Sequence, residues 1–212
     1  MSRQRVRIRF RKEGDLRLIS HRDLMRSMDR LFRRAEIQLA MSQGFRPKPK
    51  ISFPLALAVG VAGRDEVMEL ELADTWEDEQ LARTLEKHAP PGLEFTSVET
   101  IAPQEAKAQV VRVTYEIDAS SIPQAELQAA IERFLKESEY WIVREDNQKK
   151  VDLRAPVQSL GLEDSMLKMI FKVSRQGTAR PREILAAIGL DSLEQTGIFL
   201  TRTEVELEKA HA

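Results

Sequence analysis

Residues Arg5–Arg11 read RVRIRFR, and this short stretch indicates how the first half of the chain folds. Arginine alternates with Val6, Ile8 and Phe10, so a strand here has one apolar face and one arginine face. The segment VMELELA at residues 67–73 alternates in the same way, with Glu69 and Glu71 opposite its apolar side chains. We predict two strands of one sheet whose apolar faces cover a common core.

The segments between and after these strands complete a six-element pattern. Ser20 followed by Asp23 resembles a capping box and begins a helix over about 21–36. Gly44 and two prolines end that pattern, and Pro54 suggests an edge or a bulge in the next strand. The remaining predicted elements are a strand at 51–59, a helix at 77–88 and a strand at 94–101. The order strand-helix-strand-strand-helix-strand is that of ferredoxin-like domains.

The pattern then restarts after an apolar-poor stretch at 103–109. The predicted elements are strands at 110–117, 140–144, 149–154, 166–173 and 198–206, and helices at 123–138 and 181–188. We therefore predict an α+β protein of two tandem ferredoxin-like (βαββαβ) domains with antiparallel sheets. Their bounds are 1–102 and 110–212, with a linker at 103–109.

Charge is distributed unevenly along the chain. The total is 33 Lys/Arg against 34 Asp/Glu, but residues 1–50 hold 15 basic and five acidic groups, whereas residues 51–212 hold 18 and 29. Such asymmetry points to a polyanionic partner. No apolar run is long enough to span a membrane, and no secretory signal is evident. The absence of Cys excludes disulfides and fits a cytoplasmic location.

The arginine face of the first strand is the first candidate binding surface. In the predicted sheet, Arg5, Arg7 and Arg9 stand on the face that the helices leave open. RNA-recognition modules of this topology bind single strands on that face with aromatic residues. Here phosphate contacts and guanidinium stacking would replace them. The alternative is a cross-strand ion ladder with Glu69 and Glu71.

The first helix and the loop after it are also basic. Arg22, Arg26, Arg30 and Arg33 form a helical stripe, which Asp23 and Asp29 can partly pair. The loop SQGFRPKPK, residues 42–50, alternates cations with prolines that favour an extended backbone. Phe45 either stacks on a base or anchors the loop inward. The candidate RNA-binding residues of the helix and loop are Arg22, Arg26, Gln43, Phe45, Arg46, Lys48 and Lys50.

The second domain has a weaker basic surface. Arg180 and Arg182 lie in the loop SRQGTARPRE, residues 174–183, at a predicted helix start whose free N–H groups can bind phosphate. A plain basic turn is the alternative. Lys150 and Lys172 are among further cations predicted on the open face of this domain.

His21 is the only histidine in a motif-like setting, because it begins the first helix directly after Ser20. It is a candidate general base, and the alternative is a capping or core residue. A Ser-His neighbour pair is not a catalytic triad, since adjacent side chains on a helix do not face each other. No phosphate-binding loop, dinucleotide-binding motif or zinc-protease motif occurs. We predict no metal site and no cofactor.

The run LRLISHRDLMRSMDRLFRRAEIQLAMSQGFRPKPKISF, Leu16 to Phe53, resembles the radical SAM-linked domain family, a bacterial domain of unknown function. The resemblance continues through ARPREIL at 179–185 and TRTE at 201–204. It implies that a separate cobalamin-type radical SAM protein is the partner, because a chain without Cys cannot hold that enzyme's iron–sulfur cluster. Members often carry Asn and His where this loop has Arg46 and Lys48, which makes this loop more basic.

The chain also resembles, more distantly, the CRISPR repeat-processing endonucleases, which have tandem ferredoxin-like domains and often a histidine near the first helix. The leading hypothesis is an RNA-binding accessory protein that presents RNA to a radical SAM partner for modification. One alternative is a metal-independent endoribonuclease that uses His21. The other is an interaction module that docks an acidic partner protein. The sequence predicts no oligomeric state.

Overall fold

The computed structural model describes residues 3–174 and 179–209. These residues form two compact units, the first made of residues up to 110 with a short return at 207–209, and the second of residues 111–206. Each unit combines helices with a mostly antiparallel sheet. The predicted α+β class is therefore confirmed.

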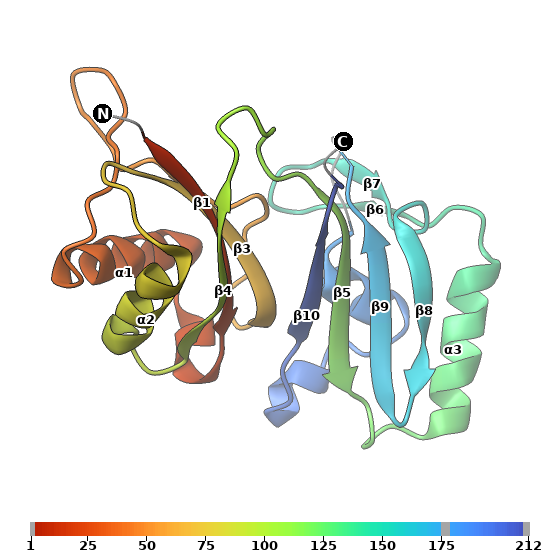
Figure 1. The fold of residues 1–212 in the computed structure, drawn as a ribbon. Coiled ribbons are helices and arrows are strands. Elements are labelled where there is room, and N and C mark those ends of the chain that lie inside the picture. Colours follow the sequence, from red (N-terminus) through yellow and green to blue (C-terminus); the bar gives the residue numbers. More distant parts are fainter. Residues whose placement is uncertain (1–2, 175–178, 210–212) are drawn as a thin grey trace. The chain divides into compact units, whose positions relative to one another are not determined.

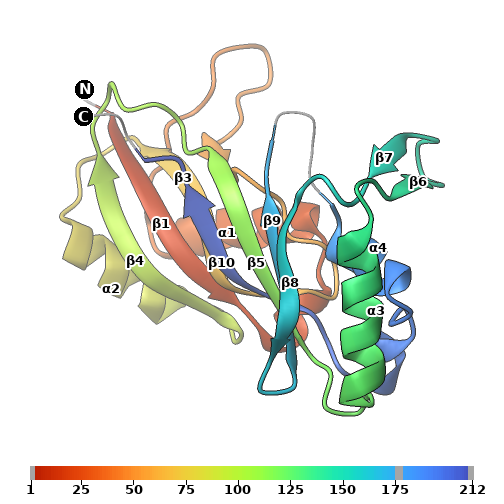
Figure 2. The same ribbon diagram turned by 90° about the vertical axis from the view of Figure 1, so that its right-hand side faces the viewer.

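The first unit contains a sheet with two helices on one face (Figures 1 and 2). Its strands follow the order β4-β1-β3, and β2 pairs with β3. Strand β1 is antiparallel to both neighbours. The elements in chain order are β1 (Gln4–Lys12), the 3-10 helix η1 (Gly14–Leu18), α1 (His21–Arg34), β2 (Ile51–Ser52), β3 (Ala62–Leu72), α2 (Asp78–His88) and β4 (Leu93–Ile101).

The core of the first unit follows the predicted alternation. Val6, Ile8 and Phe10 are fully buried, and they pack against the apolar faces of β3, α1 and α2. The helical contribution comes from Leu24, Met28, Leu31, Phe32, Leu81 and Leu85. Because side chains alternate across a strand, the same pairing places the arginines of β1 on the opposite sheet face.

The main strands of the second unit follow the order β10-β5-β9-β8. A two-stranded hairpin, β6 with β7, is separate from their sheet and stands apart from it in Figure 2. The elements are β5 (Val110–Asp118), α3 (Gln124–Lys136), β6 (Trp141–Val143), β7 (Lys150–Asp152), β8 (Val157–Glu163), β9 (Met166–Lys172), α4 (Pro181–Ala187), the 3-10 helix η2 (Leu193–Thr196) and β10 (Thr201–Leu207).

The observed strands differ from the predicted ones in three ways. The strand expected at 51–59 is only two residues long, because Pro54 follows closely and cannot donate a ladder hydrogen bond. Strand β8 was not predicted, yet it pairs with β9 through a tight turn at Asp164 and Ser165, both with positive φ. The predicted strands at 140–144 and 149–154 form the separate β6–β7 hairpin instead of joining the sheet.

Within the described part of the chain, no helix has the length and apolar character needed to cross a membrane.

Candidate nucleic-acid interface

The arginine face of β1 is an ion ladder. In the register of β1 and β3, Arg7 lies opposite Glu69. The guanidinium of Arg7 donates to Oε1 of Glu69 from Nε at 3.1 Å and from Nη2 at 2.8 Å. Nη2 also lies 2.8 Å from Oε1 of Glu105. The side chain of Arg7 is 17% exposed and that of Glu69 only 6%.

The other arginines of this face are paired in the same way. Arg5 contacts Glu69 at 3.6 Å and donates to the backbone oxygen of Glu105 at 2.5 Å. Arg9 pairs with Asp65 at 2.5 Å, and Arg11 pairs with Glu94 at 3.3 Å. Arg5, Arg7 and Arg9, which we predicted as RNA contacts, therefore lie in a network of carboxylates that leaves little charge for a phosphate backbone.

Burial and pairing act in opposite directions on Arg7. Desolvation by burial lowers its pKa, but hydrogen bonds to Glu69 and Glu105 outweigh it, so the pKa is raised overall. The stretch predicted as a linker takes part in this network, because Glu105 belongs to it and the N–H of Ala108 donates to Glu69 at 3.1 Å. Of the two acids predicted for this ladder, Glu69 belongs to it and Glu71 pairs with Lys50 instead. The acids Asp65, Glu94 and Glu105 were not predicted. The period-two alternation of β3 places Asp65 on the same face as Glu69, and this pattern would have indicated Asp65.

The arginine stripe of α1 is exposed and only half paired. Arg26 lies 3.2 Å from Asp23, and Arg33 lies 2.9 Å from Asp29. Arg22 and Arg30 are exposed, and neither makes a hydrogen bond or ion pair within the part of the chain that the structure describes. This helix therefore presents cationic charge to solvent, which the paired face of β1 does not.

The basic loop is a hairpin that extends the edge of β3, and we call residues 39–51 the basic hairpin. Its two limbs are joined by backbone hydrogen bonds from Lys50 to Ala40 at 2.9 Å and from Ser42 to Lys48 at 2.8 Å. Glu71 of β3 bonds to both limbs at its base, through Ala40 and Lys50. The hairpin, drawn in orange, projects away from α1 and α2 (Figure 1).

The tip of the basic hairpin, residues 43–48, carries its candidate binding residues into solvent. Phe45 has a relative exposure of 108%, so its ring touches almost nothing, and it is not the inward anchor that the sequence allowed. Gln43, Arg46 and Lys48 are exposed, and their side chains have no hydrogen-bond or ion-pair partner among the described residues. Lys50 differs, because its ammonium is held 2.5 Å from Glu71.

Gly44 sets the shape of this tip. Its φ is +130°, a conformation that side-chain-bearing residues rarely adopt. The proline at position 47 lies between Arg46 and Lys48 and stiffens the return limb. An aromatic ring followed by two cations is therefore displayed on a locally constrained backbone.

His21 is packed against an aromatic ring. Its imidazole meets Phe53 edge-on with 5.0 Å between ring centroids, and Phe53 meets Phe10 in the same manner at 6.0 Å. Ser20 caps α1 by accepting the Asp23 N–H at 3.1 Å. The described residues contain no cluster of three or more His, Cys, Asp or Glu side chains that could hold a metal ion.

The two arginines predicted in the second unit are both engaged. Arg180 pairs with Asp146 at 2.7 Å. Arg182 forms two hydrogen bonds with Glu194, at 2.5 and 2.9 Å, which raise the pKa of its guanidinium. The preceding residues 175–178 of the predicted loop lie outside the described residues. The helix start at Pro181 is thus surrounded by local ion pairs.

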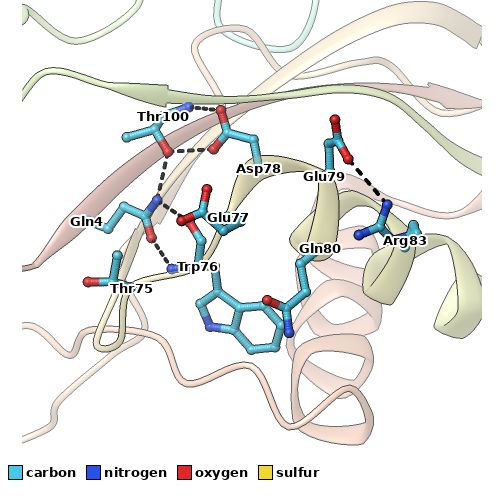
Figure 3. A pocket seen from close by; sticks show the side chains of 9 residues that line it. All are labelled: Gln4, Thr75, Trp76, Glu77, Asp78, Glu79, Gln80, Arg83 and Thr100. Atoms are coloured by element: carbon cyan, nitrogen blue, oxygen red, sulfur yellow. Dashed lines mark hydrogen bonds and ion pairs between the residues drawn. The ribbon is translucent and has the colours of Figure 1, made fainter.

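A hollow of about 780 Å³ lies at the start of α2, but its chemistry does not suit an anion. Figure 3 shows the amide of Gln4 bracketing the backbone of Trp76, with a donated and an accepted hydrogen bond of 2.8 Å each. Asp78 accepts from the backbone and hydroxyl of Thr100 at 3.0 and 2.5 Å. The acidic residues that line the hollow are Glu77, Asp78 and Glu79. We interpret this network as a clamp that fixes α2 to the sheet.

Fold and surface together define an α+β protein with an ion-paired sheet face and an aromatic-tipped basic hairpin. The chain belongs to the family described as "Uncharacterized protein conserved in bacteria (DUF2344)", whose profile matches residues 5–181. No curated protein has significant sequence similarity to the chain.

Among solved structures, one similar chain is titled "Crystal Structure of an Unknown Protein from Galdieria sulphuraria". It is 11% identical, with 98% of this chain and 100% of that chain covered, and the TM-score is 0.29. A likeness at this level carries no argument about fold or function.

Proposed function

We propose that the protein binds single-stranded RNA through the basic hairpin and the adjoining arginine stripe of α1. The observation that carries this proposal is the full exposure of Phe45 directly before Arg46 and Lys48, two exposed cations whose side chains have no partner among the described residues. A bare aromatic ring in water is unfavourable, and an unstacked base is the flat surface that such a ring accepts. The two cations that follow the ring along the chain would hold the neighbouring phosphates.

General energetics support a single-stranded ligand. Stacking of one base on an aromatic side chain contributes about 1–3 kcal/mol and tolerates any base. The cations add a salt-dependent term that does not depend on sequence. A protein of this kind would grip exposed loops or ends of RNA and contribute little base specificity itself.

We further infer that each unit is a ferredoxin-like module. Numbering the strands of the first unit along the chain gives the spatial order 4-1-3-2 for β4, β1, β3 and β2. The main sheet of the second unit, with β5, β8, β9 and β10 as strands one to four, has the same order. In RNA-binding modules of this topology the open sheet face binds RNA. The ion ladder on β1 is the reason that we assign binding to the hairpin instead.

The RNA would be presented to a separate cobalamin-type radical SAM protein for modification. The support for this part is the resemblance of Leu16–Phe53 to the radical SAM-linked domain family. The same run contains α1 and the whole basic hairpin, so the residues that carry the resemblance coincide with the proposed RNA surface. Co-purification of such an enzyme that is lost on nuclease treatment would mean that RNA bridges the two proteins. Co-purification that survives it would mean direct docking.

The decisive experiment measures binding of a labelled single-stranded oligoribonucleotide by fluorescence anisotropy between 50 and 200 mM salt. The variant Arg46→Ala/Lys48→Ala should bind at least tenfold more weakly at 50 mM salt. The slope of its log binding constant against log salt concentration should fall in magnitude by about 1.4, or about 0.7 for each lost phosphate contact. The control is Arg83→Ala/Lys87→Ala, which removes the same charge from exposed positions on α2.

Equal weakening in both variants would mean that net charge alone drives binding, and the proposal would fail. It would also fail if the parent protein did not bind at 50 mM salt. Incubation of the same RNA with the protein in EDTA tests for cleavage. Cleavage that disappears in His21→Ala would replace the accessory role with an endoribonuclease.

A further inference from the structure

The second unit has an exposed aromatic hairpin of its own. On the β6–β7 hairpin, Trp141 is 49% exposed and Val143 is 58% exposed. Trp141 is fixed by its indole N–H, which donates to Glu139 at 2.8 Å. The ammonium of Lys150 lies 4.7 Å from the indole ring centroid, in a cation–π contact. Half of a tryptophan side chain in solvent beside a lysine is a common feature of binding surfaces.

Trp141 lines a cavity of about 610 Å³ together with cationic and small apolar side chains. This volume lies within the range usual for ligand sites, roughly 300–1,000 Å³. The apolar walls come from Val151, Ala155 and Pro156. The cationic lining residues are Arg144, Lys149, Lys150 and Lys172.

Positive charge predominates among the residues that line this cavity. Among the described residues that line it, Asp152 is the only acid, and one oxygen of that carboxylate already accepts the backbone N–H groups of Tyr140 and Arg154 at 2.8 and 2.9 Å. Arg144 is held by Glu183 through hydrogen bonds of 2.6 and 2.8 Å. Lys149, Lys150 and Lys172 are exposed, so the cavity has a positive lining although residues 111–212 have 14 basic against 17 acidic groups.

We propose that this cavity, the Trp141 pocket, binds one nucleotide of single-stranded RNA, an inference that takes its ligand class from the proposed function. The base stacks on Trp141, and the phosphate lies among Lys149, Lys150 and Lys172. Lys150 covers the ring in the free protein. Its flexible stem lets the ammonium move to the ring edge, where the phosphate of a stacked nucleotide would lie. The combination of one flat aromatic face with a ring of lysines fits a nucleotide better than an acidic peptide, which offers charge without a planar group.

The two tryptophans of the chain make a direct test possible. In the variant Trp76→Phe, Trp141 is the only tryptophan and reports on its own pocket. Titration with a hexanucleotide of adenylate should quench its emission in a saturable way that weakens with salt. In Trp76→Phe/Lys150→Gln/Lys172→Gln the affinity of the pocket itself, measured by this quenching, should fall about tenfold. The matched control adds Arg133→Gln/Lys136→Gln, exposed cations of α3, and should bind like the Trp76→Phe parent.

Binding of the hexanucleotide without any change in Trp141 emission would overturn the inference. Equal affinities of the pocket variant and its control would do the same. Quenching by a hexaglutamate peptide as strong as that by the hexanucleotide would assign the pocket to an acidic protein partner instead. Circular dichroism of each variant confirms that a lost signal is not lost folding.

The two proposals fail in distinguishable ways. Adding Phe45→Ala/Arg46→Ala/Lys48→Ala to the Trp76→Phe protein removes the hairpin tip but leaves the Trp141 pocket intact. Unchanged total affinity in that protein would contradict the hairpin proposal and leave the pocket untouched. Persistent quenching with reduced total affinity would support both sites.

Discussion

Exposure of individual aromatic side chains, more than their number, is the basis on which we propose binding residues for this protein. The chain has eight phenylalanines. Phe10 and Phe171 are fully buried, and Phe53 is half-buried between His21 and Phe10, whereas Phe45 is entirely in solvent. A residue whose removal costs the fold nothing is the most informative one to remove, because any effect must arise from binding.

Replacing Phe45 should therefore separate stability from binding. Phe45→Ala should change the free energy of unfolding by less than about 0.5 kcal/mol, since the ring has no contacts to lose. RNA affinity should fall about 5- to 150-fold, which corresponds to loss of one stacked base at 1–3 kcal/mol. Phe45→Tyr should retain affinity and Phe45→Leu should not. Equal binding by the Leu and Tyr variants would show that the contact is apolar and not stacking.

Replacing Glu69, unlike replacing Phe45, should lower the free energy of unfolding. It is the carboxylate that Arg5 and Arg7 share, so Glu69→Ala removes an ion-pair partner from both. Arg7 keeps the carboxylate of Glu105, and Arg5 keeps the backbone oxygen of Glu105. Breaking a buried pair costs about 3–5 kcal/mol, and the remaining contacts and residual exposure of these arginines reduce the expected loss to about 2–3 kcal/mol. Urea denaturation measures it. Glu105→Ala, at the more exposed end of the network, should cost about 1 kcal/mol or less. A larger loss of stability in Glu105→Ala than in Glu69→Ala would contradict the prediction that Glu69 contributes more.

At the level of elements, alternation in the sequence predicted the strands of the first unit. Ion pairs with acids elsewhere in the chain determine whether the polar face of a strand is free to bind a ligand. The RVRIRFR pattern correctly places Val6, Ile8 and Phe10 in the core. It could not distinguish a free arginine face from a paired one, because the pairing acids Asp65, Glu94 and Glu105 are 56 to 98 residues away along the chain. Strand register and the path of residues 103–109 are tertiary properties that no local pattern encodes.

The basic hairpin shows a related limit. The residues SQGFRPKPK predict an extended, cationic loop, and the exposed tip agrees with that. The pairing of its limbs with each other and with Glu71 depends on the edge of β3 being free, which the local sequence does not reveal. In the second unit, Trp141 drew no prediction because a single tryptophan in a short apolar run looks like a core residue. Only its exposure of 49% identifies it as a surface residue.

The start of α1 should be sensitive to acid. A hydrogen bond from Ser20, with further help from Arg26 and Arg22, lowers the pKa of Asp23 below its usual 3.8, against a smaller opposing effect of burial. A carboxylate with a depressed folded-state pKa stabilises the fold above the unfolded-state value, and this contribution disappears as the pH falls through the folded-state pKa. Asp23 should therefore couple to Ser20 at pH 7 and lose that coupling below about pH 3.8.

A double-mutant cycle measures this coupling. The single variants Ser20→Ala and Asp23→Asn and the double variant are denatured in urea at pH 7 and near pH 3. The interaction energy between the two positions should be favourable at pH 7 and shrink toward zero in acid. The same interaction energy at both pH values would show that the cap does not depend on the charge of Asp23.

At the level of the whole molecule, the folded units have balanced charges although the chain halves do not. Residues 1–50 have a net charge of +10, but residues 1–110 contain 19 basic and 17 acidic groups, because the acids of 51–110 fold onto the arginines of β1. What remains for a polyanion is local: the stripe of α1 and the basic hairpin in one unit, and the Trp141 pocket in the other. On the proposed function, the protein contacts RNA at these separate points, and its affinity depends on how many of them one strand can engage.

Two separate contact points predict a characteristic dependence on RNA length. A hexanucleotide engages one site at a time, so the hairpin-tip and Trp141-pocket variants should each reduce its binding modestly. A strand long enough to reach both sites binds the second one intramolecularly, which can raise affinity about 10²- to 10⁴-fold. Affinity should therefore rise steeply once the strand is long enough to reach both sites and then level off. Each single-site variant should abolish that rise while retaining hexanucleotide binding at its intact site. A smooth increase in proportion to length, the same in parent and variants, would mean that the two sites act independently.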